Sequence, residues 1–232
     1  MKYITAFIMV FFIILIACES KKTPQESTDH VKDAYTFATP KGSELLPAER
    51  GPVRDVYEPP AVNLASFKLK LDGKVRTHLE LGWRQIQEMQ SVSTDTMLMY
   101  CVEGWEVWGV WRGISINELL DSAQPAEDAT HVLFHGIDGY TTAMPMTYLR
   151  KYNAILAYEV NGRPLKKHDG YPLRLVAFGL FGYKWAKYVT RLELISGSRL
   201  GFWEKYGYDD KALVPVERRR FYEGANAEPI EF

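Results

Sequence analysis

Short apolar segments of strand length follow one another through the second half of the chain, and they restrict the folds it can adopt. The segments are "HVLFHGI" (131–137), "AILAYEV" (154–160), "YPLRLVAF" (171–178) and "YVTRLELI" (188–195), separated by Gly, Pro, Asn or Asp. Runs of this length between turn-forming residues are typical of β-strands. The chain therefore predicts a fold in which sheets supply most of the core.

Residues 67–120 add further strand pattern and only short helices. "FKLKLDGKV" (67–75) alternates apolar and polar residues and contains Asp72-Gly73, a turn signal typical of hairpins. "LGWRQIQEM" (81–89) has helical spacing, and "SINELL" opens with Ser115 and Glu118 at capping-box spacing. Because strands outnumber short helices, we expect an α+β, mainly β fold in a single domain.

The overall charge excludes one class of partner. The chain has 232 residues and a formal net charge of −1, with 47% hydrophobic and 13% aromatic residues. Such a composition indicates a globular protein with a large core, and it offers no strong basic field for nucleic acid. We therefore expect no nucleic-acid partner.

The N-terminus has the pattern of an export signal. Lys2 precedes the apolar run 7–17, which is too short to span a membrane comfortably. The run ends in Leu-Ile-Ala-Cys18, which resembles a bacterial lipobox. We expect residues 1–17 to be a lipoprotein signal peptide and Cys18 to carry the lipid. The protein would then be anchored at the bacterial cell envelope, facing the periplasm or exterior; an uncleaved membrane anchor is the alternative.

Two kinds of segment follow the signal. Residues 18–60 are polar at first and then rich in proline, which predicts a lipid-anchored tether and an extended arm that drapes over the domain. Residues 61–232 are expected to form the compact domain.

A lipidated Cys18 would leave Cys101, in "MLMYCVEGWEVWG", without a partner in the chain. An unpaired cysteine in an exported protein forms an intermolecular bridge, reacts, binds a metal or is simply buried. The residues alone leave these four possibilities open.

The segment "GLFGYKWAK" (179–187) predicts an anion site. Its glycines let backbone N–H groups approach a ligand, and Lys184, Lys187 and the preceding Arg174 add positive charge. A strand with solvated lysines is the alternative. His131 and His135 give only a weak metal pattern, because the segment reads as a strand without an HExxH arrangement.

Several blocks together resemble the molybdopterin-binding domain of the sulfite oxidase family, through about residues 63–208. They are "YCVEGW", "GVWRGISINELL", "FHGIDGYTTAMPM", "ILAYEVNGRPL", "GYPLRLVAFGLFGYKWAKYV" and "GFWEKYGY". The "CVEGW" form is most similar to the bacterial periplasmic branch that contains the methionine-sulfoxide reductase. The resemblance implies an oxidoreductase with Mo-molybdopterin as cofactor.

The resemblance also implies roles for individual residues. Cys101 would be the thiolate ligand of molybdenum, a role that suits a soft sulfur donor. Tyr140 would lie beside the reacting oxygen; a structural aromatic is the alternative. The cofactor would also be held by Arg174, Gly182, Tyr183, Lys184 and Lys187.

The chain departs from the family pattern in three places. Asp169 stands where family members commonly have histidine, and His168 is displaced by one position. Gly104 and Trp105 follow the cysteine where sulfite oxidases place an arginine for the sulfite anion. The family's N-terminal asparagine- or histidine-containing cofactor contacts have no recognisable match, and the region expected to take their place is "YEPP" (57–60).

These features together predict an oxygen-atom transfer enzyme. Its substrate would be a small S-oxide or N-oxide, or a protein methionine sulfoxide, in a pocket that Glu103, Trp105 and Trp108 line or support. The chain has no CxxCH haem motif, so a separate haem- or quinone-linked redox partner is expected. A sulfite-oxidising enzyme and a non-catalytic envelope protein that retains the fold are the alternatives.

Overall fold

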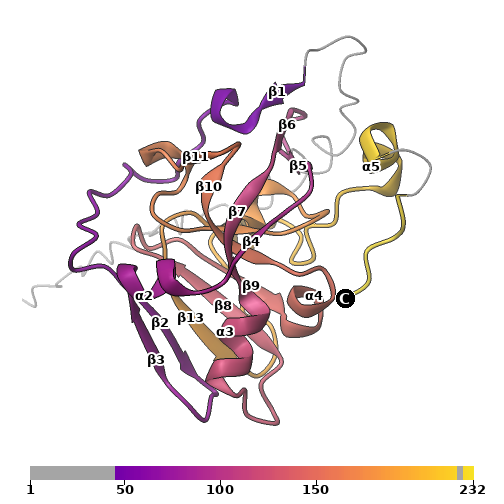
Figure 1. The fold of residues 1–232 in the computed structure, drawn as a ribbon. Coiled ribbons are helices and arrows are strands. Elements are labelled where there is room, and N and C mark those ends of the chain that lie inside the picture. The colour runs from indigo at the N-terminus through magenta and orange to yellow at the C-terminus, as the bar shows by residue number, and fades with distance from the viewer. Residues whose placement is uncertain (1–44, 224–226) are drawn as a thin grey trace, which may run out of the picture.

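The computed structural model describes residues 45–223 and 227–232, so the signal peptide and Cys18 lie outside the described residues. The described residues form three sheets, joined by loops and short helices (Figure 1). Among the helices described, none has the length and apolar character needed to cross a bilayer.

One of the two five-stranded sheets packs against the apolar core. Its strand order is β3–β2–β13–β8–β9, with bounds Leu79–Gly82, Lys68–Gly73, Val189–Ile195, His131–Gly136 and Thr141–Pro145. β2 runs parallel to β13, and the other neighbours are antiparallel. The alternation seen in the sequence is confirmed in β2, where Leu69 and Leu71 are fully buried and Lys68 and Lys70 are exposed.

A second five-stranded sheet carries β12, which begins at Arg174. Its order is β11–β10–β7–β4 with β12 also paired to β10, and the bounds are Arg163–Pro164, Ile155–Val160, Trp111–Ser115, Ser91–Ser93 and Arg174–Val176. The strand predicted over 171–178 is therefore confirmed only in its middle.

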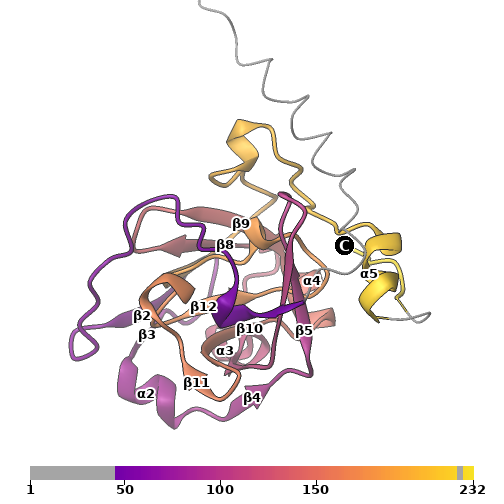
Figure 2. The ribbon, with the colours of Figure 1, turned by 90° about the horizontal axis from the view of Figure 1, so that it is seen from above.

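The third sheet is small and holds Cys101. β5 (Met97–Tyr100) and β6 (Glu106–Gly109) form an antiparallel hairpin, and the loop between them contains the cysteine. β1 (Leu46–Pro47) pairs in parallel with β6. Residues 45–67 then run from β1 down one side of the molecule to β2, drawn in indigo (Figures 1 and 2). The described part of the arm thus packs on the domain.

The helices are short, as the sequence predicted. They are α2 (Trp83–Glu88), α3 (Ile116–Ala123), α4 (Met146–Lys151) and α5 (Val216–Glu223), with 3-10 turns η1 (Ala48–Arg50), η2 (Lys167–Asp169), η3 (Gly182–Lys184) and η4 (Glu204–Tyr206). Ser115 is the N-cap of α3, but its side chain makes no cap hydrogen bond, so the predicted capping box is absent.

One continuous apolar cluster joins the two five-stranded sheets with α3 and α4. Above it, two contacts tie the hairpin to the second sheet and η3. Tyr100 forms an isolated parallel bridge with Phe181, and Arg174 Nη2 lies 3.1 Å from the sulfur of Met99. The Cys101 loop is thereby held next to Arg174 and the glycine-rich segment.

Candidate active site

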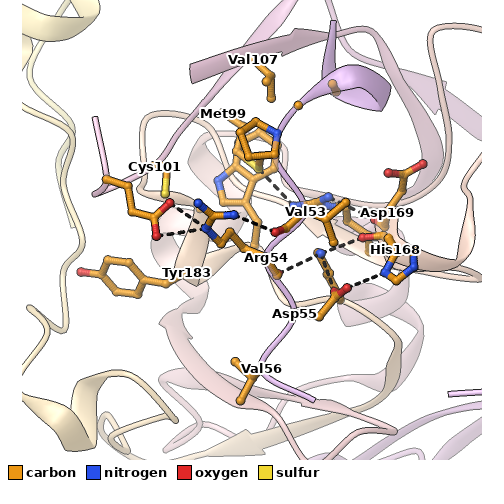
Figure 3. Close-up of a pocket in the computed structure, with 18 of the residues that line it drawn as sticks. Val53, Arg54, Asp55, Val56, Met99, Cys101, Val107, His168, Asp169 and Tyr183 are labelled. Atoms are coloured by element: carbon orange, nitrogen blue, oxygen red, sulfur yellow. Dashed lines mark hydrogen bonds and ion pairs between the residues drawn. The ribbon is translucent and has the colours of Figure 1, made fainter. Parts of the chain in front are cut away.

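A pocket opens where the hairpin, η3, β12 and the arm meet (Figure 3). Eight of the residues predicted from the sequence line it: Cys101, Glu103, Trp105, Tyr140, Arg174, Gly182, Tyr183 and Lys187. They come from segments far apart in the chain, so the fold brings together most of the predicted site.

Cys101 is a free thiol on the loop between β5 and β6. Its backbone N–H donates to Trp105 O at 2.8 Å, and Gly104, with φ of 93°, closes the turn. Burial raises the pKa of the thiol to about 11, although the N–H of Glu103 hydrogen bonds to the sulfur and opposes this shift. A bound metal ion would reverse the balance, because it stabilises the thiolate directly.

Arg174 is a buried cation that lacks a full set of partners. Its guanidinium donates to Asp169 O at 3.1 Å and to the sulfur of Met99, a weak acceptor. Nε is buried and has no hydrogen-bond partner among the described residues. The group lies over the rings of Trp111 and Trp185, and burial lowers its pKa to about 10. A buried guanidinium with an unused donor is suited to binding an anion.

Lys187 faces the same pocket, but the arm already engages it. Its ammonium donates to Asp55 Oδ1 at 2.7 Å, to His168 O at 2.7 Å and to Arg54 O at 3.1 Å. Asp55 also accepts from Tyr188 at 2.9 Å and contacts the ring of His168 at 2.7 Å. Asp55 is therefore the point at which the arm is fastened across the pocket.

The displaced histidine and the aspartate that follows it both reach the pocket. Both His168 and Asp169 line the pocket on the side opposite Cys101 (Figure 3). The ring of His168 pairs with Asp55, and Asp169 presents its carbonyl oxygen to Arg174. The η2 turn thus places the imidazole at the pocket although it stands one position earlier than in the family pattern.

Next to Cys101, the arm supplies a positive charge, that of Arg54, whereas the cysteine loop itself contains no arginine. Arg54 Nε lies 2.7 Å from Glu103 Oε2, and Trp105 Nε1 donates to the same oxygen at 2.9 Å. Figure 3 shows Arg54 crossing toward the side of the pocket where Cys101 lies. The carboxylate of Glu103 neutralises this guanidinium.

Aromatic side chains form much of the remaining wall. Tyr140 is 7% exposed, and its hydroxyl donates to the backbone oxygen of Tyr183. Burial, followed by the charge of Glu204, raises its pKa well above the ordinary value, so the hydroxyl stays protonated. Trp203 and Tyr208 complete the wall, with ring centroids 5.0 Å apart.

Lys184 and Trp108, both predicted for the site, do not line the pocket. The η3 turn directs Lys184 inward, where its ammonium bonds to Ala143 O, Glu204 Oε1 and Asp210 Oδ1 at 3.0, 2.6 and 3.1 Å. All three protons are thereby used within the protein. Trp108 packs on the small apolar cluster behind the hairpin.

The sequence did not point to the arm residues Arg54 and Asp55, which line the pocket. The N-terminal cofactor contacts were expected at residues 57–60, and these do not line it. The available signal was "VRDV" (53–56), a pair of opposite charges between apolar residues directly before the proline-rich segment. Nothing in that pattern shows which distant residues it will meet.

The chemistry of the residues fits molybdopterin. In the part of the chain that the structure describes, no three His, Cys, Asp or Glu side chains gather to hold a metal by themselves. The pocket offers one thiol and, across from it, a buried guanidinium with an open donor. Such a pair suits a metal that brings most of its ligands on an anionic organic cofactor.

Comparison with known proteins agrees with this chemistry. The family described as "Oxidoreductase molybdopterin binding domain" matches residues 56–203, so the chain belongs to that family. The predicted sulfite oxidase family resemblance, mainly β fold, oxidoreductase class and molybdopterin cofactor are thereby confirmed.

Individual relatives cover the chain to different extents. An uncharacterized oxidoreductase, YuiH of Bacillus subtilis, is 33% identical over 160 residues, spanning 68% of this chain and 80% of that protein. The protein-methionine-sulfoxide reductase catalytic subunit MsrP of Gluconobacter oxydans is 28% identical over 205 residues, spanning 81% of this chain but only 62% of MsrP.

A solved structure supports the fold alone. The sulfane dehydrogenase SoxCD from Paracoccus pantotrophus superposes with a TM-score of 0.62 at 18% identity, covering 81% of this chain and 57% of that chain.

Proposed function

We propose that this protein is a molybdopterin-dependent reductase of sulfoxides, with methionine sulfoxide in a polypeptide as its substrate. The observation that carries the proposal is the charge balance of the pocket. Relatives named as methionine-sulfoxide reductase catalytic subunits support it.

The charges that line the pocket nearly cancel. The cations are Arg54, Arg174 and Lys187, and the carboxylates are Asp55, Glu103, Asp138 and Asp169. Arg54 is paired with Glu103, and Lys187 with Asp55, each at 2.7 Å. A sulfite anion would therefore meet no uncompensated cation beside Cys101, whereas a neutral sulfoxide loses little by leaving water.

The aromatic side chains that line the pocket favour a thioether as the product. Sulfur and methyl groups pack favourably against aromatic rings, which Trp105, Trp203 and Tyr208 supply at the pocket. Outside the wall, Phe202 contacts the rings of Tyr57 and Tyr206, which are 49% and 58% exposed. Exposed aromatic residues beside a pocket favour a substrate that extends beyond it, such as a polypeptide.

The residues would divide the work as follows. Cys101 would hold the metal through its sulfur, and the cofactor, when bound, would supply two-electron oxygen-atom transfer. Arg174, whose Nε has no partner among the described residues, and Lys187, Gly182 and Tyr183, which line the same pocket, would hold the anionic part of the cofactor. The Tyr140 hydroxyl, kept protonated by burial, now donates to the backbone oxygen of Tyr183, and it would donate to the substrate oxygen only by exchanging that acceptor.

The proposal also includes the location of the protein and its source of electrons. Lipidation at Cys18 would hold the domain at the bacterial envelope, through the tether of residues 18–60. Reducing equivalents would come from a separate haem- or quinone-linked protein, and relatives named catalytic subunits agree with such a division. Labelling with a radioactive fatty acid in the wild type and in Cys18→Ala tests the anchor; equal labelling contradicts it.

The substrate assignment is tested by turnover. Protein made in a host that assembles molybdopterin is assayed with reduced viologen and either free methionine sulfoxide or an oxidised, unfolded protein. In parallel, sulfite is offered with an artificial acceptor. We expect sulfoxide reduction, faster with the polypeptide, and none in Cys101→Ser. Oxidation of sulfite alone would identify a sulfite-oxidising enzyme, and a preparation free of metal and pterin would identify a non-catalytic protein.

A further inference from the structure

Arg218, on α5, reaches the loop that carries Cys101 from behind the pocket. Its Nη1 donates to Cys101 O at 3.2 Å, and Nη2 lies 3.4 Å from Trp105 O. These two carbonyl oxygens belong to the residues at either end of the cysteine loop. A single guanidinium therefore spans the base of the turn.

The same guanidinium is held in place by a carboxylate and two rings. Nη2 donates to Glu106 Oε2 at 3.0 Å, in a pair whose side chains are 14% and 1% exposed. The cation also lies over the rings of Tyr100 and Phe181, at 5.5 and 5.7 Å from their centroids. Charge-assisted bonds and cation–π contacts are strong when shielded from water.

The two rings belong to the two segments that meet at the pocket, although neither ring lines it. Tyr100 directly precedes Cys101, and Phe181 directly precedes Gly182 of the anion segment. Arg218 is thus the contact through which the cysteine loop and the η3 segment share one support. It lies beyond residues 56–203, the part of the chain that matches the family.

We propose that Arg218 is a positioning residue, which fixes the Cys101 loop relative to the Gly182 segment and so directs the sulfur into the pocket. The inference rests on the proposed role of Cys101 as a metal ligand. Groups that orient a ligand in this way typically change metal affinity by about ten- to a hundredfold when they are altered.

The test compares Arg218→Lys with Arg191→Lys. Lysine retains the charge for Glu106 but cannot bridge both carbonyl oxygens, because it lacks the planar fork. Arg191 is the control, since its Nε donates to both carboxylate oxygens of Asp72 at 2.8 and 2.9 Å and the residue does not line the pocket. Both variants are prepared as holoproteins and as apoproteins.

Four quantities are measured: molybdenum and pterin content per chain, the Mo(V) electron paramagnetic resonance spectrum, the melting temperature, and the rate at which N-ethylmaleimide alkylates Cys101 in the apoprotein. We expect Arg218→Lys to melt near the wild type, hold about tenfold less molybdenum, give an altered spectrum and alkylate at a different rate. Arg191→Lys should match the wild type in content, spectrum and alkylation.

Wild-type values of content, spectrum and alkylation in folded Arg218→Lys would overturn the proposal. If that variant does not fold, Arg218→Gln, which retains one donor group but no charge, replaces it. Failure of both to fold would make Arg218 a requirement for the fold and overturn the positioning role. If the wild type itself holds no molybdenum, the proposed function fails, and the alkylation rates still decide the role of Arg218.

Discussion

Arg174 and Lys184 are both buried cations on segments that sequence analysis assigned to one anion site, yet the structure treats them differently. Lys184 has a side chain 1% exposed and places its ammonium between Glu204 and Asp210. Arg174 is 5% exposed, and its Nε has no partner among the described residues. Only Arg174 lines the pocket.

This difference indicates that Lys184 stabilises the fold, whereas Arg174 is available to bind a ligand. Removing a charge from water is costly, and the protein compensates that cost for Lys184 with its own carboxylates. For Arg174 it supplies a carbonyl, a thioether and two indole rings, none of which is an anion. A bound phosphate would complete this site, whereas Lys184 needs no ligand.

The largest effect is expected from breaking the paired cation. Lys184→Met leaves the carboxylate of Glu204, 0% exposed, without its counter-charge, although Thr142 still donates to it at 2.7 Å. Loss of one member of a buried pair costs about 3–5 kcal/mol. Urea unfolding of the apoprotein measures this loss, with the exposed Lys205→Met as control. A change under 1 kcal/mol, about the value of a surface pair, would show that the ion pair is not structural.

Arg174→Met should give the opposite pattern. The apoprotein should keep its unfolding free energy within about 1 kcal/mol, because the thioether still packs on the indole rings. Pterin binding should weaken by about ten- to a hundredfold, as expected for the loss of a charged hydrogen bond of about 1.5–3 kcal/mol. Pterin fluorescence after release measures the content, with Arg112→Met as control. Unchanged pterin content would remove Arg174 from the binding site.

Lys187 is intermediate between Lys184 and Arg174, because it lines the pocket and is also paired with a carboxylate. The substitution Asp55→Asn tests what that carboxylate contributes to stability. Burial raises the pKa of Asp55, but hydrogen bonds from Lys187, His168 and Tyr188 outweigh it and hold the pKa below its ordinary 3.8. The charge of Asp55 therefore stabilises the fold, fully so above about pH 3.8, and this stability is lost as the pH falls through the lower folded value. The difference in melting temperature between wild type and variant should be constant near neutral pH and shrink below pH 3.8. A difference that grows on acidification would contradict this account.

Tyr140→Phe should have only a small effect on stability. The variant loses the hydrogen bond to the oxygen of Tyr183, worth about 1 kcal/mol. Stability and sulfoxide turnover are measured together, with Tyr206→Phe as an exposed control. A fall in kcat at unchanged KM supports contact with the reacting oxygen, whereas loss of stability with unchanged kcat makes Tyr140 only a structural aromatic.

The sequence predicted strands better than the directions of side chains. Alternation in 67–75 and apolar runs at 131–137 and 188–195 follow directly from the period of a strand, and the structure confirms them. For the predicted anion-binding segment, residues 179–187, the directions of the side chains could not be predicted. Its composition showed glycines and lysines, but the η3 turn, which sends Lys184 inward and leaves Gly182 at the pocket, depends on contacts with η4 and β9.

Contacts between residues from distant segments could not be predicted from the sequence pattern. Arg54 and Asp55 meet the pocket because β1 pairs with β6, and Arg218 meets the cysteine loop because α5 packs behind it. No periodicity within the arm or helix specifies those pairings. The motif-bearing residues were predictable, while the groups that neutralise and orient them required the three-dimensional structure.

The central claim is that the sulfur of Cys101 binds molybdenum in this pocket. X-ray absorption at the molybdenum edge, on the holoproteins of the wild type and Cys101→Ser, measures it most directly. The account predicts that the wild type contains molybdenum and that the variant loses one sulfur neighbour of the metal, together with turnover. A wild type without molybdenum, or a variant with an unchanged sulfur shell and full activity, would contradict it.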